Sequence, residues 1–171
     1  MVRAISEAHG RVLVAGHGFV AFLNDNQLDP IAGLNAEVLN ACAIPEGWLL
    51  AGGGGVWKIN PVGAVTLILS PAINAKGPLR LCRINSDVVV SGIGISPLIW
   101  SEDRLISVEK YAKFTNQEIS DSAESLFVTS QGVRDESNRP LLPSETDKML
   151  LKAGLVGVAK CDSMDFSPDL Q

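Results

Sequence analysis

Short apolar runs alternate with turn residues along most of the chain. Four segments share one pattern of three apolar residues, a small pair, one variable residue and a glycine. They are "VLVAGHG" from Val12, "WLLAGGG" from Trp48, "VVVSGIG" from Val88 and "LFVTSQG" from Leu126. The separations between successive first small residues are 36, 40 and 38 residues, measured at Ala15, Ala51, Ser91 and Thr129. This even spacing indicates an internal repeat.

Each of these segments has further apolar runs on both sides. A short turn precedes it, in the stretches "EAHG", "IPEG", "INSD" and "SAES", and another apolar run stands before the turn. A third run follows in "FVAFL", "VWKI" and "ISPLIW", and a fourth is clearest in "VTLIL" and "LISV". The runs are short and rich in β-branched residues, and they lack a 3.6-residue period. Each unit is therefore predicted to be a meander of four antiparallel strands.

A single sheet of this size cannot bury both of its faces, and stacking several sheets around an axis solves that problem. The predicted fold class is all-β: a small β-propeller of about four four-stranded antiparallel blades, closed or partial. The chain is predicted to form one domain, 1–171, with units at about 2–33, 38–70, 78–108 and 116–143. The charged, proline-rich stretch 134–148 is predicted to be a loop, and 149–171 to supply closing strands and a tail.

The order of strands resembles a known group of folds. An inner strand, an apolar second strand that ends in Ala-Gly, and a glycine-led third strand resemble the blades of WD40-like and photosystem-assembly-type β-propellers, from about Val2 to Pro143. The resemblance is at the level of the fold, because no Gly-His…Trp-Asp pair recurs and "IWSED" from Ile99 occurs once. A sialidase-type aspartate box is also missing. The resemblance implies a propeller and assigns no catalytic residue.

The first glycine segment has a competing interpretation. Residues Gly16 to Ala21 match Gly-x-Gly-x-x-Ala after an apolar strand, the pattern of a dinucleotide-binding turn. However, the same motif recurs at Gly52 and Gly92, and no helix is predicted after either. The "GGGG" stretch that starts at Gly52 lacks the Lys-Ser/Thr pair of a phosphate-binding loop. Hairpin turns are therefore favoured, and no cofactor is predicted.

Composition narrows the class of protein. Hydrophobic residues make up 46% of the chain and charged residues 19%, which is too apolar for a disordered chain. The net charge of -5 argues against nucleic acid or an anionic membrane surface as partner. No apolar stretch reaches the roughly 20 residues that span a bilayer. With no secretory signal expected and three cysteines at spacings unlike metal sites, the predicted location is cytoplasmic.

Candidate catalytic and metal-binding residues are sparse. His9 and His17 fall in predicted turns without a partner at zinc-ligand spacing, so no metal site is predicted. No Gly-x-Ser-x-Gly elbow exists, and the acidic pair at Glu102 falls in a predicted turn, so no catalytic residue is assigned. Cys42 and Cys82 occupy equivalent inner-strand positions. Two small buried side chains are favoured there over a thiol pair or soft-metal site.

A protein surface is the predicted ligand. Propellers bind at the turns between second and third strands and at the connections between blades. The candidate partner-binding residues are His17, Gly53, Trp57, Ile93, Trp100 and Gln131. Trp57 and Trp100 either pack between blades or anchor an interface, and both options stay open. Inner-strand charges predict a polar central channel; they are Arg3, Glu7, Arg80 and Arg83.

The predicted function is a non-catalytic module that docks on one protein partner. An immunity protein that neutralises a toxin is one concrete form. The alternatives are an enzyme on a propeller scaffold, such as a hydrolase or lyase, a subunit of a larger assembly, and a nucleotide-binding protein. An incomplete propeller would also predict a homo-oligomer, in which a second copy completes the ring.

Overall fold

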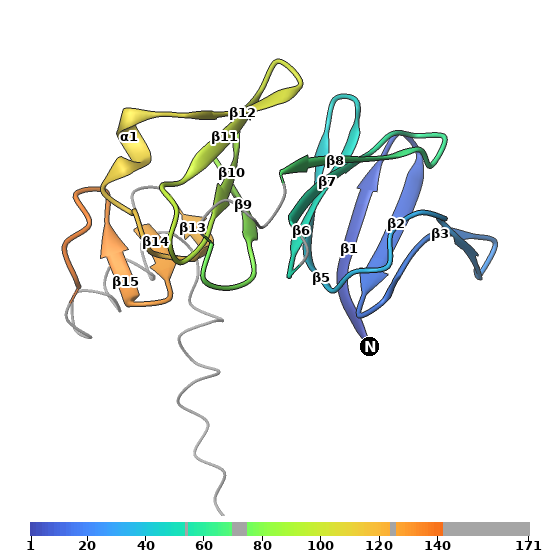
Figure 1. Ribbon diagram of the computed structural model, residues 1–171, viewed down its shortest axis with the longest axis horizontal. Helices are drawn as coiled ribbons and strands as arrows, with labels where there is room; N and C mark the ends of the chain where they lie inside the picture. Colours follow the sequence, from blue (N-terminus) through green and yellow to red (C-terminus); the bar gives the residue numbers. More distant parts are fainter. Residues whose placement is uncertain (54, 70–74, 124–125, 142–171) are drawn as a thin grey trace, which may run out of the picture.

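The computed structural model describes residues 1–53, 55–69, 75–123 and 126–141. In this part of the chain most residues are in strands, which form four antiparallel sheets that follow one another along the sequence (Figure 1). The one short helix is α1 (Glu109–Ala112). Within the described ranges, no helix has both the length and the apolar character needed to cross a bilayer. The prediction of an all-β fold is confirmed.

Each sheet is a meander in which consecutive strands pair. The first sheet contains β1 (Val2–Ala8), β2 (Arg11–Gly16), β3 (Phe19–Asn24) and β4 (Gln27–Pro30). The second contains β5 (Val38–Ile44), β6 (Gly47–Gly52), β7 (Gly55–Ile59) and β8 (Val65–Leu69). The third contains β9 (Arg80–Ile84), β10 (Asp87–Ser91), β11 (Leu98–Ser101) and β12 (Arg104–Ser107). The fourth contains β13 (Ile119–Ala123), β14 (Leu126–Thr129) and β15 (Gly132–Asp135).

Tight turns set the hairpins. The turn between β11 and β12 is made by Glu102 and Asp103, whose φ angles are 49° and 64°. Asp25 and Asn26 make the β3–β4 turn in the same way, with φ of 46° and 65°. Two successive positive φ angles match the right-handed twist of the flanking strands, and short polar side chains adopt them at low cost. These turn residues fix the register of the strands on either side.

Consecutive sheets pack face to face through three apolar clusters. The first and second sheets bury Leu13, Phe22, Trp48, Leu50 and Ile59 between them. The second and third sheets bury Leu49, Val56, Leu81, Val90 and Ile95. The third and fourth bury Cys82, Val89, Phe114, Ile119 and Phe127. The innermost strands β1, β5, β9 and β13 consequently lie beside one another in that order.

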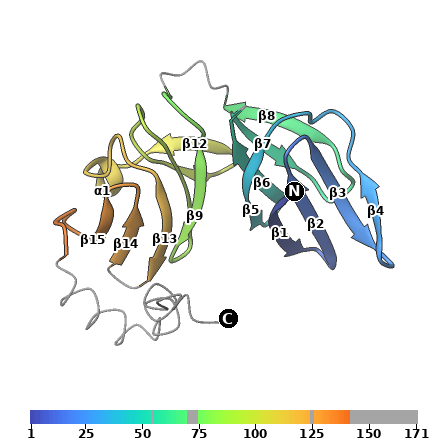
Figure 2. The same ribbon diagram turned by 90° about the horizontal axis from the view of Figure 1, so that it is seen from below.

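The two end sheets do not pack against each other in the described part of the chain. No contact comparable to those between consecutive sheets joins the first sheet to the fourth. Figures 1 and 2 show β1–β4 and β13–β15 at opposite ends of the molecule. The predicted all-β fold of about four antiparallel sheets is therefore confirmed, and the arrangement of the described residues is compatible with a partial propeller. The closing strands predicted for 149–171 lie outside the described residues.

The fourth sheet corrects two details of the sequence prediction. Arg134 and Asp135 belong to β15 and not to the predicted loop, because they pair with Phe127 and Leu126. In the first sheet the pairing register shifts directly after the Val2–Gly16 pair. In the fourth sheet the same shift comes directly after the Ile119–Thr129 pair. Thr129 therefore corresponds to Gly16, and Val128 corresponds to Ala15. The shift by one residue arises because a two-residue turn comes directly after Thr129, as it does after Gly16.

The dinucleotide-binding interpretation of the first glycine segment is wrong. Strands β2 and β3 pair antiparallel, and Gly16 faces Phe19 across a two-residue turn. A strand therefore stands where a crossover helix would have to begin. Gly18 has a φ of 71°, which is the conformation that this turn requires.

Candidate functional site

The predicted partner-binding turns are joined to the connections between sheets. The backbone N–H of Gly53 donates to the carbonyl of Glu37 at 3.1 Å, and His17 forms an isolated bridge with the same residue. The N–H of Lys76 donates to the carbonyl of Ile93 at 2.8 Å. Three of the predicted residues thus lie on one face, which we call the turn face. His17, Gly53 and Ile93 are all exposed there.

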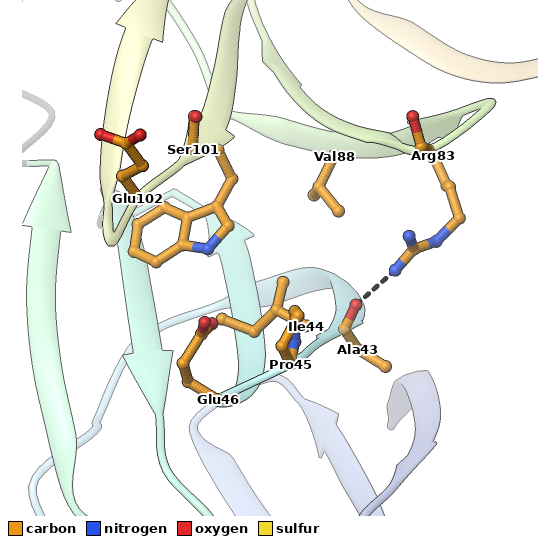
Figure 3. A pocket seen from close by; sticks show the side chains of 10 residues that line it. Ala43, Ile44, Pro45, Glu46, Arg83, Val88, Ser101 and Glu102 are labelled. Carbon is orange, nitrogen blue, oxygen red and sulfur yellow. Dashed lines mark hydrogen bonds between the residues drawn. The ribbon is translucent and has the colours of Figure 1, made fainter.

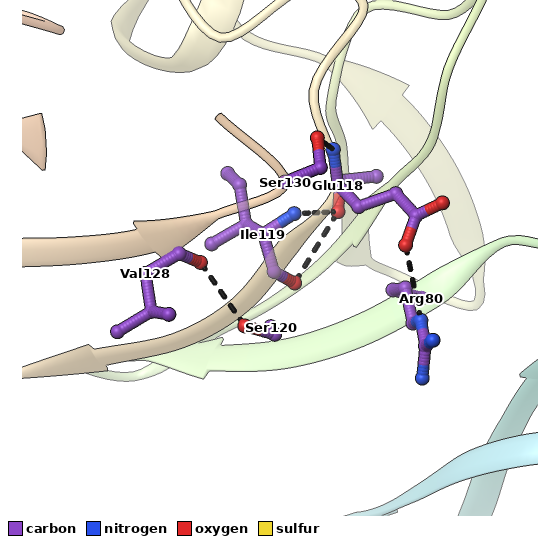
Figure 4. A network of polar contacts seen from close by, with 7 residues as sticks. Arg80, Glu118, Ile119, Ser120, Val128 and Ser130 are labelled. Carbon is purple, nitrogen blue, oxygen red and sulfur yellow. Dashed lines mark hydrogen bonds and ion pairs between the residues drawn. The ribbon is translucent and has the colours of Figure 1, made fainter. Parts of the chain in front are cut away.

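The turn face continues onto the fourth sheet. The N–H of Ser130 donates to the carbonyl of Glu118 at 2.9 Å, and the Glu118 N–H donates back to the Ser130 hydroxyl at 3.2 Å (Figure 4). Gln131 follows in the same turn, exposed, with its N–H donated to Thr129 Oγ1 at 3.1 Å. The Glu118 carboxylate pairs with Arg80 at 3.2 Å. One of the predicted channel charges is therefore neutralised inside the chain.

Trp57 has a structural role. It is 7% exposed and packs in the cluster between the first and second sheets. Its partner across the strands is Leu50, which is fully buried in the same cluster. A side chain enclosed in this way has no free face for a partner. Of the two roles left open by the sequence, Trp57 takes the packing role.

Trp100 is placed differently, because only part of its ring is covered. It packs against the cluster between the second and third sheets and also lines a cavity of about 230 Å³. We call this cavity the Trp100 cleft; its walls include Ile44, Pro45, Glu46, Arg83, Trp100 and Glu102. Figure 3 shows Glu46 and Glu102 on one side of the cleft and Arg83 on the other. Turns of the second and third sheets supply the two acids.

The basic side chains around the cleft already have partners within the chain. The Arg83 guanidinium donates to the carbonyl of Ala43, so its charge is used within the wall. Lys58 forms an ion pair with Asp103, and its ammonium lies 5.7 Å from the centroid of the Trp100 ring.

The carboxylates on the rim have weaker partners. Glu102 lies 3.8 Å from Arg104, and both side chains are mostly exposed, so this pair contributes little. In the part of the chain that the structure describes, Glu46 forms no salt bridge. The cleft therefore presents two solvated carboxylates beside an indole.

A second cavity of about 220 Å³ lies between the third and fourth sheets, lined in part by Lys110, Tyr111 and Phe127. Asp87 accepts hydrogen bonds from both the Lys110 ammonium and the Tyr111 hydroxyl. The hydrogen bond that the Lys110 ammonium donates to Asp87 raises the pKa of Lys110. Because the carboxylate already holds this ammonium, the second cavity offers a weaker site than the Trp100 cleft.

The cysteines occupy inner strands as expected. Cys82 is buried on β9, and Cys42 is half-buried on β5. Burial raises the pKa of the Cys42 thiol, and the nearby Arg83 opposes that rise only in part. A protonated thiol is a poor nucleophile and a poor metal ligand. Among the described residues, no group of three or more His, Cys, Asp or Glu side chains is arranged to hold a metal ion.

Sequence reasoning found Trp100 and missed its surroundings. Arg83 belongs to the same sheet as Trp100, whereas Glu46 belongs to the second sheet and reaches Trp100 only because the second and third sheets pack together. The signal available in the sequence was the acidic turn directly after Trp100, at Glu102 and Asp103. Glu46 stands in the β5–β6 turn, and the sequence holds no signal that links this turn to Trp100.

Comparisons with known proteins bear on the fold alone. No family model matches the chain, and no curated protein matches it. Among solved structures, the chain is similar to the crystal structure of the computationally designed Ika4 protein, with a TM-score of 0.55 and 14% sequence identity. The match covers 78% of this chain and 89% of the designed one. The chain thus shares its arrangement of strands with a designed protein, and the resemblance to WD40-like blades stays a prediction.

Proposed function

We propose that the chain is a non-catalytic protein-binding module whose Trp100 cleft receives a basic side chain of its partner. The observation that supports this is the meeting of one indole and two exposed carboxylates, Glu46 and Glu102, at the junction of two sheets. An aromatic ring attracts a cation over its face, and carboxylates form charge-assisted hydrogen bonds with guanidinium groups. An arginine fits both kinds of contact.

The charge of the whole chain supports the same kind of partner. A net charge of -5 favours encounter with a basic protein surface, because complementary potentials speed association. An inhibitor that covers a basic surface of its target, such as an immunity protein on a toxin, is one form of this function. Both rim acids also stand on turns of hairpins, so the backbone that positions them is already fixed before binding.

Affinity capture with matched variants tests the proposal. The tagged chain is incubated with lysate of its source cells, and retained proteins are quantified by mass spectrometry for wild type, Glu46→Lys and Trp100→Leu. We expect one partner that is retained by the wild type and falls by about tenfold or more in both variants, because a buried charge contact between proteins is worth about 2 kcal/mol or more.

Asp29→Lys provides the control. Asp29 is an exposed acid on the edge strand β4, so this variant makes the same change of charge away from the Trp100 cleft. It should retain the partner at the level of the wild type. Equal loss of the partner in Asp29→Lys would show that only total charge matters, and unchanged retention in Glu46→Lys and Trp100→Leu would exclude the cleft.

A further inference from the structure

The first sheet exposes an apolar face at positions that are buried elsewhere. Val2 and Val38 hold the same place in the pairing of their sheets, but Val2 is 49% exposed and Val38 is fully buried. Leu23 and Ile59 also correspond, and only Leu23 is exposed. Ile5, on the same face as Leu23, is 68% exposed. These residues face away from the second sheet, where a preceding sheet would pack.

The fourth sheet exposes an apolar residue on the face that points away from the third sheet. Val128 corresponds in register to Ala15 and Ala51, which are fully buried against the sheet that follows each of them. Val128 itself is 37% exposed, and Val133 pairs with it on the neighbouring strand. This face points away from the third sheet, where a following sheet would pack. We call the faces around Ile5 and Val128 the two open faces.

We propose that a second copy of the chain covers both open faces. The face around Ile5 in one copy packs on the face around Val128 in the other, and the reverse contact forms at the same time. Two arcs of four sheets then give one ring of eight. This contact continues an interface that the chain already uses three times, between its own consecutive sheets. A head-to-tail contact of this kind forms a ring when the rotation closes.

A second copy fits both open faces, because each face has the register of one that a whole sheet covers inside the chain. A second copy supplies a finished sheet at both faces with one symmetry operation. The proposal concerns the open faces and does not depend on the function proposed for the Trp100 cleft.

Sedimentation equilibrium of the full chain tests the proposal. We expect the wild type to have twice the monomer mass of 18.1 kDa at micromolar concentration. Ile5→Lys and Val128→Glu each place a charge in both contacts of a symmetric pair. Each variant alone should therefore be a monomer, with self-association weakened by about tenfold or more, because an unpaired buried charge is costly.

Mixing the two variants distinguishes a ring from any other dimer. In the mixed pair one contact is unmodified, and the other sets the introduced lysine against the introduced glutamate. The mixture should recover the dimer mass, which a dimer formed through two identical patches would not do. Val62→Glu, at a site 84% exposed outside both open faces, is the control and should leave the mass unchanged.

Far-ultraviolet circular dichroism of each variant confirms that it is folded. A wild-type chain that stays monomeric at about 100 μM would overturn the proposal, since a specific dimer of this kind should form by then. In that case segment 142–171 or another protein is the occupant of the open faces. A dimer that persists in both single variants would also overturn it.

Discussion

The buried side chain of Ser91 connects the third and fourth sheets, because it bonds both the N–H and the carbonyl of Ile119. Its hydroxyl accepts the N–H of Ile119 at 2.8 Å and donates to the carbonyl of Ile119 at 3.4 Å. Ser91→Ala leaves a buried N–H without a partner, so the free energy of unfolding should fall by about 1–3 kcal/mol in urea titrations. Ser120→Ala, which removes an exposed hydroxyl bonded to Val128, should cost less than about 0.5 kcal/mol. Equal effects of the two changes would contradict this role of Ser91.

The Asp135 carboxylate makes the stability of the fourth sheet fall as the pH becomes acidic. Its carboxylate accepts the N–H groups of Arg139 and Ser137 at 2.9 Å and the Arg139 side chain at 2.7 Å. The hydrogen bond from the Arg139 backbone is the main cause that lowers the pKa of Asp135. Because the folded-state pKa lies below the unfolded value of about 3.9, the stabilisation is complete above that pH and is lost as the pH falls.

Asp135→Asn should therefore reduce the stability of the chain at neutral pH and change it less at low pH. Urea titrations of both proteins between pH 7 and pH 3 check this, and the gap between the two curves should narrow below about pH 4. A gap that stays constant over the whole range would show that the Asp135 carboxylate does not titrate in the way described.

At the scale of elements, the hairpin turns carry most of what the sequence could predict. Paired turn residues such as Glu102 and Asp103 mark the ends of strands, and apolar triplets mark the second strand of each sheet. The alignment of the fourth unit missed by one residue because Thr129 is small, like Ala15, although pairing gives it the place of Gly16. Residue type alone cannot distinguish neighbouring places in a strand, and hydrogen-bond register can.

A substitution at Gly47 tests how closely β6 and β7 of the second sheet approach each other. Its φ is 137°, and a Cβ at this position would overlap the carbonyl oxygen of Ile59 on the neighbouring strand. Gly10 also has a positive φ, of 67°, but a Cβ there would meet no atom within 4 Å. Gly10→Ala should cost about 1 kcal/mol from backbone strain alone, and Gly47→Ala about 3 kcal/mol or more. Thermal or urea unfolding that ranks the two equally would contradict the close approach.

At the scale of the whole molecule, the chain has two faces on which a partner could dock. The turn face follows from the order of strands, and the sequence was sufficient to place His17, Gly53 and Ile93 there. The Trp100 cleft depends on the packing of the second sheet on the third, which brings together residues from separate units. Sequence patterns describe single units well, and they contain no direct signal for contacts between units.

Hydrogen–deuterium exchange distinguishes the two faces most directly. Exchange is measured for the chain alone and for the chain saturated with the captured partner. If the partner binds at the Trp100 cleft, exchange should slow at the β5–β6 turn around Glu46 and at the β11–β12 turn around Glu102, with little change at His17 or Gln131. Protection confined to the turn face, with none beside the Trp100 cleft, would contradict it.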